Sequence, residues 1–121
     1  MVIEEIETGP DLIKRLIAQE MREYHRAHTK PAETRSSTHA DLVALRTLED
    51  FKAALIEPVE TEVLFSGGQV LACWSVTRSN GAYRVIYLPQ AALFSLAVES
   101  MFGPVDIGVH GPAIAVFSSV G

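Results

Sequence analysis

Residues 59–88 read VETEVLFSGGQVLACWSVTRSNGAYRVIYL, and this stretch decides the fold. Two turn signals separate three apolar runs in it, namely Ser66-Gly67-Gly68-Gln69 and Ser79-Asn80-Gly81-Ala82. Gly-Gly and Asn-Gly between apolar runs are strong hairpin signals, because tight hairpin turns need positive φ at their centre. The stretch therefore predicts a meander of three antiparallel strands.

The register of this meander follows if both loops have two residues. Phe65 then faces Val70, Val63 faces Ala72, and Trp74 faces Tyr87, with side chains alternating between the two faces. The predicted core face carries Val59, Val63, Phe65, Val70, Ala72, Trp74, Val76, Val85 and Tyr87. The other face has an apolar end that needs a cover, which could be a helix, another subunit or a ligand; this end comprises Leu64, Leu71, Cys73, Ile86 and Leu88. A three-residue loop at either turn would shift this register.

Composition places limits on the class of protein. A chain of 121 residues that is 48% apolar suits one domain, residues 1–121, with a proper core. A single cysteine excludes an intrachain disulfide, and the acidic start lacks a secretory pattern, so we expect a cytoplasmic protein. No apolar run approaches the roughly 18 residues of a membrane span, so we expect no membrane association. A net charge of −5 argues against nucleic acid as a partner.

Two helices are predicted before the meander. Apolar residues at helical spacing predict an amphipathic helix over about 11–27, followed by a polar loop through residue 37. A second helix is predicted from a Thr38 cap to Pro58. Residues 40–46 could instead be a strand, because Thr47-Leu48-Glu49-Asp50 is itself a good helix start; the helix is favoured.

The C-terminal part of the chain predicts one more helix and a hairpin. Residues 90–102 are apolar almost all round and are followed by Gly103-Pro104, which predicts a largely buried helix. Strands are then predicted over 105–109 and 113–120, joined at Gly111-Pro112. The order of two helices, three strands, a helix and two strands predicts an α+β fold.

Metal binding has one weak candidate. His25 and His28 share a face of the first predicted helix, and Glu20, Glu23 or His39 could complete a site. Solvated imidazoles near a helix C-terminus are the favoured interpretation, because they suit the helix dipole. The chain has no H-E-x-x-H motif and no pair of cysteines, so we expect no metal and no cofactor.

Four residues are weak catalytic candidates, namely Cys73, Glu99, Asp106 and His110. Cys73 is favoured as a small core residue over a nucleophile. Asp106 and His110 share a strand face, but four residues of regular strand span about 13 Å, which is too far for a hydrogen bond. Glu99 is favoured as an exposed residue over a buried carboxylate that faces a pocket.

Association is the favoured function. Residues 63–121 carry four charged side chains among largely apolar elements, so we expect a small structural or regulatory protein, non-catalytic, that forms a homodimer through this half. The expected patch is Leu64, Leu71, Ile86 and Leu88, or else Leu93, Leu96 and Val98. The alternative is a small-molecule-binding protein or small enzyme, with a site between the 90–102 helix and the 105–117 hairpin that uses His110, Asp106, Glu99 and Cys73. A third possibility is an acidic protein that neutralises a basic partner.

Overall fold

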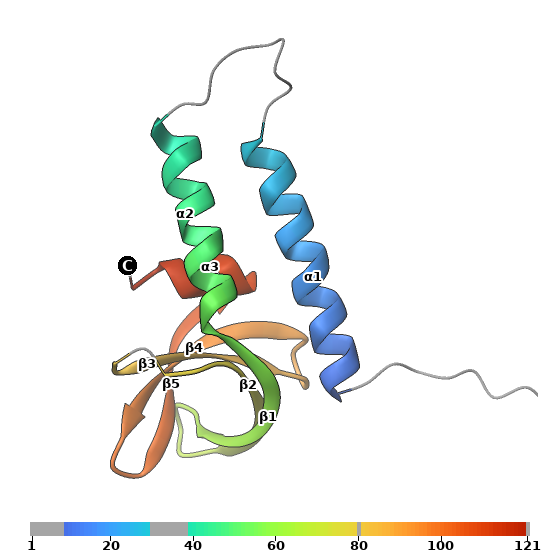
Figure 1. The fold of residues 1–121 in the computed structure, drawn as a ribbon. Coiled ribbons are helices and arrows are strands. Elements are labelled where there is room, and N and C mark those ends of the chain that lie inside the picture. Colours follow the sequence, from blue (N-terminus) through green and yellow to red (C-terminus); the bar gives the residue numbers. More distant parts are fainter. Residues whose placement is uncertain (1–8, 30–38, 80, 121) are drawn as a thin grey trace, which may run out of the picture.

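The computed structural model describes residues 9–29, 39–79 and 81–120. Its elements are α1 (Gly9–His28), α2 (His39–Ala54), β1 (Leu55–Leu64), β2 (Val70–Thr77), β3 (Tyr83–Leu88), β4 (Leu93–Ser100), β5 (Gly103–Gly111) and α3 (Ala113–Ser118). The predicted mixed α+β class is confirmed. The two long helices stand together on one side of a five-stranded barrel, and the short α3 lies between them and the strands (Figure 1).

The barrel is a meander that closes on itself in the order β1-β2-β3-β4-β5. Each strand is antiparallel to the one before it, so the first and the fifth strands run in the same direction. An odd number of strands therefore requires a parallel closing pair, and the structure has one, where Leu64 pairs with Val105.

Two hydrophobic clusters result from this closure. The outer cluster joins the helices to the outer face of β2, β3 and β4, and contains Ile13, Ile17, Leu48, Phe51, Val76, Val85, Tyr87, Phe94, Leu96, Ala113, Ile114 and Val116. The inner cluster fills the barrel and contains Val63, Cys73, Ile86, Leu88 and Ala97. Strands β3 and β4 are consequently buried on both faces.

The first hairpin does not have the predicted two-residue loop. The Phe65 amide donates to the Gln69 carbonyl at 2.7 Å and the Gly68 amide to the Phe65 carbonyl at 3.1 Å, which leaves a three-residue loop. Gly67 and Gly68 both have positive φ, 89° and 82°. The extra residue shifts the register, so that Val63 pairs with Leu71 rather than with Ala72. The longer loop is thus the correct one of the two alternatives.

The second hairpin has the predicted register at the pair Trp74–Tyr87. Asn80 of its turn lies outside the described residues. The predicted core face is correct for Val76, Val85 and Tyr87, which are buried against the helices, but Val59 and Val70 are exposed. The apolar end of the other face needs none of the three expected covers, because closure of the barrel hides that end from water.

The predicted helix over residues 90–102 is wrong. Residues 93–100 form β4, which pairs with β3 from Leu93 to Val98. A strand in contact with a barrel interior on one face and with helices on the other is apolar on both faces. Its sequence therefore resembles that of a buried helix, and hydrophobic periodicity does not separate the two.

The predicted last strand, residues 113–120, is also wrong, since residues 113–118 form α3. The strand predicted at 105–109 is correct and extends over the whole of β5. Residues 40–46 are helical, as favoured, but α2 ends at Ala54 and Pro58 lies within β1. The predicted Thr38 cap and most of the predicted loop before α2 lie outside the described residues.

Candidate functional site

Four polar residues of the barrel form a connected network. Arg84 donates from Nη1 to the Ser75 hydroxyl at 2.9 Å and from Nε to the carboxylate of Glu99. The Ser75 hydroxyl lies 2.7 Å from that of Thr61 on β1. Glu99 is therefore partly buried and paired with a guanidinium on the neighbouring strand, rather than simply exposed as expected.

Asp106 anchors a bulge in β5. Ser95 pairs with His110 and Ala97 with Asp106, so the one residue of β4 between these pairs lies opposite three residues of β5, two more than in a regular ladder. This irregularity brings the His110 Nε2 within 3.5 Å of the Asp106 Oδ2, although a regular strand would keep them apart. The same carboxylate accepts hydrogen bonds from the Gly108 amide at 3.1 Å and from the Ser95 hydroxyl.

Cys73 lies inside the barrel, next to this cluster. Burial, together with the negative charge of Asp106, raises the pKa of the Cys73 thiol to about 11. The thiol is consequently protonated at neutral pH, whereas nucleophilic cysteines act as thiolates.

Of the four candidates, Asp106 lies close to His110 and acts on the Cys73 thiol, whereas Glu99 pairs with Arg84, and all four belong to structural contacts. The Ser95 hydroxyl donates to a carboxylate and not to a histidine, so it lacks the adjacent base that activates a nucleophile. Within the described ranges, every buried polar side-chain atom has a hydrogen-bond partner. Three cavities bounded by the described residues, of about 690, 360 and 350 Å³, are lined by none of Cys73, Glu99, Asp106 and His110.

The two histidines of α1 each contact a polar side chain. The Nδ1 of His28 is 3.5 Å from the Asp41 carboxylate on α2, and the Nε2 of His25 is 3.5 Å from the Thr29 hydroxyl. No group of three or more His, Cys, Asp or Glu side chains within residues 9–29, 39–79 and 81–120 is arranged to hold a metal ion. The described residues thus provide no metal site at these histidines.

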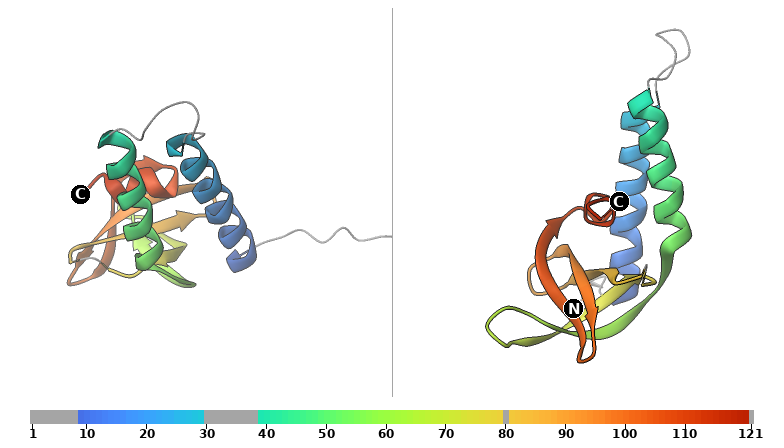
Figure 2. Two further views of the ribbon diagram at one scale, coloured as in Figure 1. Left: turned by 45° about the horizontal axis from the view of Figure 1, so that its top comes forward. Right: turned by 90° about the vertical axis from the view of Figure 1, so that its left-hand side faces the viewer.

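The tip of the β4–β5 hairpin displays two large apolar side chains. Met101 is 89% and Phe102 87% exposed, between the paired residues Ser100 and Gly103. The hairpin points away from the outer ends of the helical pair in both Figure 1 and the right-hand view of Figure 2. Sequence reasoning missed this tip because it placed both residues at the end of a buried helix.

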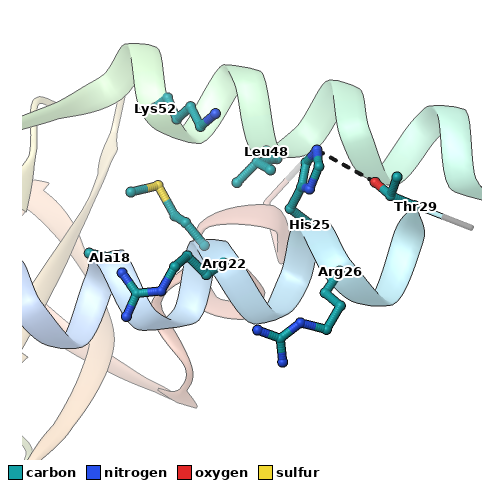
Figure 3. A pocket seen from close by; sticks show the side chains of 8 residues that line it. Ala18, Arg22, His25, Arg26, Thr29, Leu48 and Lys52 are labelled. Atoms are coloured by element: carbon teal, nitrogen blue, oxygen red, sulfur yellow. Dashed lines mark hydrogen bonds between the residues drawn. The ribbon is translucent and has the colours of Figure 1, made fainter.

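A groove of about 690 Å³ lies between α1 and α2. Its lining comprises Ala18, Met21, Arg22, His25, Arg26, Thr29, Leu48 and Lys52. Figure 3 shows Arg22 and Arg26 extending from α1, Lys52 on α2, and His25 and Leu48 between the two helices. The i, i+4 spacing of Arg22 and Arg26 was visible in the sequence, but the pairing of α1 with α2 was not.

Two smaller cavities, of about 360 and 350 Å³, flank α3. The first lies beside α2 and is lined in part by Asp50, Arg78 and Phe117. The second lies between α1 and the barrel, and Glu20 is part of its wall. The site expected between a 90–102 helix and a 105–117 hairpin does not exist in that form, because neither of those elements is present as predicted.

Comparison of the chain with protein-family models, with curated proteins and with solved structures found no match. Within the described ranges, none of the helices has the length and apolar character needed to cross a membrane.

Proposed function

We propose that this protein acts by association rather than by catalysis, and that the tip of the β4–β5 hairpin is its anchor. The observation that carries the proposal is the exposure of Met101 and Phe102. Turn positions in tight hairpins normally hold Gly, Asn, Asp, Ser or Pro, each for a conformational reason. The geometry of this turn favours neither methionine nor phenylalanine, so a contact with another molecule explains the presence of these two side chains better.

The chemistry of the two side chains fits an interface. Phenylalanine and methionine are enriched at the centres of protein interfaces, where a few buried side chains supply most of the binding energy. Further exposed apolar side chains lie on strands of the same barrel and can widen the contact; these are Val59 on β1, Val70 on β2 and Ile107 on β5.

A second copy of this chain is the proposed partner. Between Leu93 and Gly111 the chain contains no lysine or arginine, so the hairpin lacks the basic residues that attract an anionic membrane surface. Its two carboxylates are engaged, Glu99 with Arg84 and Asp106 inside the barrel, where its side chain is 8% exposed. Two hairpin tips can therefore meet across a two-fold axis without strong charge repulsion.

Sedimentation velocity of the full chain, from about 5 to 500 µM, tests the proposal over the range of weak to moderate association. We expect the wild type to reach the mass of a dimer, and the variant Met101→Ser/Phe102→Ser to remain a monomer. Because both side chains are exposed, the circular dichroism spectrum and melting temperature of the variant should match the wild type.

The matched control is Leu42→Ser, which removes a 58% exposed leucine from α2. This variant should dimerise like the wild type. A wild-type monomer at the highest concentration would overturn the proposal of a homodimer, and a dimer that survives the double substitution would remove the tip as its anchor.

A further inference from the structure

The groove between α1 and α2 combines an apolar floor with basic rims. Ala18, Met21 and Leu48 supply the apolar part of the lining. The lining also contains Arg22, Arg26 and Lys52, and it contains no Asp or Glu. In Figure 3 the ribbon of α3 lies behind the two helices, and the labelled side chains of the groove stand in front of it. The helical pair thus has one side packed on α3 and one side without a partner in the described chain.

The positive charge of this groove is largely uncompensated. The ion pairs formed among the described residues involve neither Arg22 nor Arg26. The Nζ of Lys52 is 3.6 Å from a carboxylate oxygen of Glu49, but both side chains are well exposed, so that pair is weak. A protein of net charge −5 therefore carries a local surplus of positive charge at a concave, partly apolar surface.

We propose that this groove binds an acidic amphipathic helix of a protein partner. Along α1 the groove extends from Ala18 to Thr29, about 16 Å of helix axis, which matches about three turns of a partner helix. Arg22 and Arg26 are one turn apart, so carboxylates one turn apart on the partner can pair with both. Apolar side chains on the adjoining face of the partner would pack on Met21 and Leu48, in the usual manner of a helix in a groove.

A protein helix fits these features better than a nucleic acid does. A phosphate backbone would pair with the arginines but would leave the apolar floor without a complementary surface. The chain as a whole is negatively charged and would repel a long polyanion at low ionic strength, whereas a short acidic helix senses mainly the local field of the groove.

Selection of peptides on the full-length protein tests this proposal and does not require the partner to be identified first. The probe is a displayed library of random peptides of about 14 residues, long enough for three helical turns. We expect the enriched peptides to carry Asp or Glu one turn apart beside an apolar stripe, and to become helical on binding. Fluorescence anisotropy of the enriched peptides then compares the wild type with Arg22→Glu/Arg26→Glu, for which we expect binding at least about tenfold weaker.

The matched control is Arg46→Glu/Arg78→Glu, which makes the same change in net charge away from the groove. It should bind the peptides within about twofold of the wild type, and circular dichroism should show that both variants fold. Enriched peptides without acidic residues, or peptides that bind Arg22→Glu/Arg26→Glu as tightly as the wild type, would overturn the proposal. So would a DNA duplex that binds more tightly than the peptides and loses affinity in the same variant. The test does not involve Met101 or Phe102, so it can fail while the hairpin tip still mediates dimerisation.

Discussion

Glu20 is expected to hold α3 in place, and its removal should destabilise the protein markedly. The two carboxylate oxygens of Glu20 accept hydrogen bonds from the backbone amides of Ala113 at 2.8 Å and Ile114 at 3.1 Å. The residue before α3 is Pro112, which has no side chain able to cap the helix. A carboxylate on α1 therefore serves as the N-terminal cap of a helix more than ninety residues away in sequence.

The size of the effect follows from the two bonds. A hydrogen bond to a charged group contributes about 1.5–3 kcal/mol, and loss of a helix cap costs about 0.5–2 kcal/mol. The site is only partly buried, so we expect Glu20→Ala to lower the free energy of unfolding by about 2–3 kcal/mol. For a domain of this size, that corresponds to a fall of about 6–12 °C in melting temperature. Glu20→Gln keeps one good acceptor and should cost roughly half as much.

Urea denaturation and native-state hydrogen exchange measure the two parts of this prediction. The Ala113 and Ile114 amides should exchange faster in Glu20→Ala. The control is Glu23→Ala, because Glu23 is exposed on the same helix and, among the described residues, its carboxylate accepts only an exposed bond from Gln19. This control should stay within about 0.5 kcal/mol of the wild type. If Glu20→Ala were as stable as Glu23→Ala, the assignment of Glu20 as the cap of α3 would be refuted.

Two further predictions concern the barrel, one for its interior and one for the bulge in β5. The pKa of Cys73 is raised to about 11, against 9.0 for a free thiol, so between these two pH values the folded protein keeps a thiol proton that the unfolded chain has lost. The contribution of the protonated thiol to stability is complete below pH 9 and declines as the pH rises toward 11. Urea titrations at about pH 8 and about pH 10.5 should therefore show a smaller loss of stability in Cys73→Ala than in the wild type, and equal losses would contradict this. Gly108→Ala should destabilise the protein by about 1 kcal/mol through backbone strain alone, because φ is +80° and an added Cβ would meet nothing within 4 Å. Thermal melts check this, and a variant as stable as the wild type would show that the bulge tolerates other residues.

The elements that could be predicted are those with local signals. The helix α1 has an uninterrupted apolar stripe, and the meander has a glycine-containing signal at each turn. The register of the first hairpin depends on whether its loop has two or three residues, and the pair Gly67-Gly68 does not specify which. Local patterns therefore identified the strands of the meander correctly, but not the faces that β1 presents.

The errors at the C-terminal end have a shared cause, which is long-range contact. The apolar run in β4 is explained by barrel closure on one face and by helices on the other, and neither is visible within the run itself. The helix α3 depends on Glu20, which nothing near Ala113 in the sequence indicates. The approach of His110 to Asp106 depends on two extra residues in β5, which can be recognised only when β5 is aligned with β4.

The parallel closing pair also bears on how the barrel assembles. Each strand adds to the one made just before it, so the ladders can form in chain order with short loops to close. The exception is the pair Leu64–Val105, whose two residues are some forty positions apart. That pair is the only β1–β5 partnership within the described ladders, and β1 bears Glu57, Pro58, Glu60 and Glu62 along its length. Charges and proline discourage a strand edge from pairing with another chain. The closing contact between β1 and β5 can thus form last and open first, without exposing a strand edge that pairs readily with neighbouring molecules.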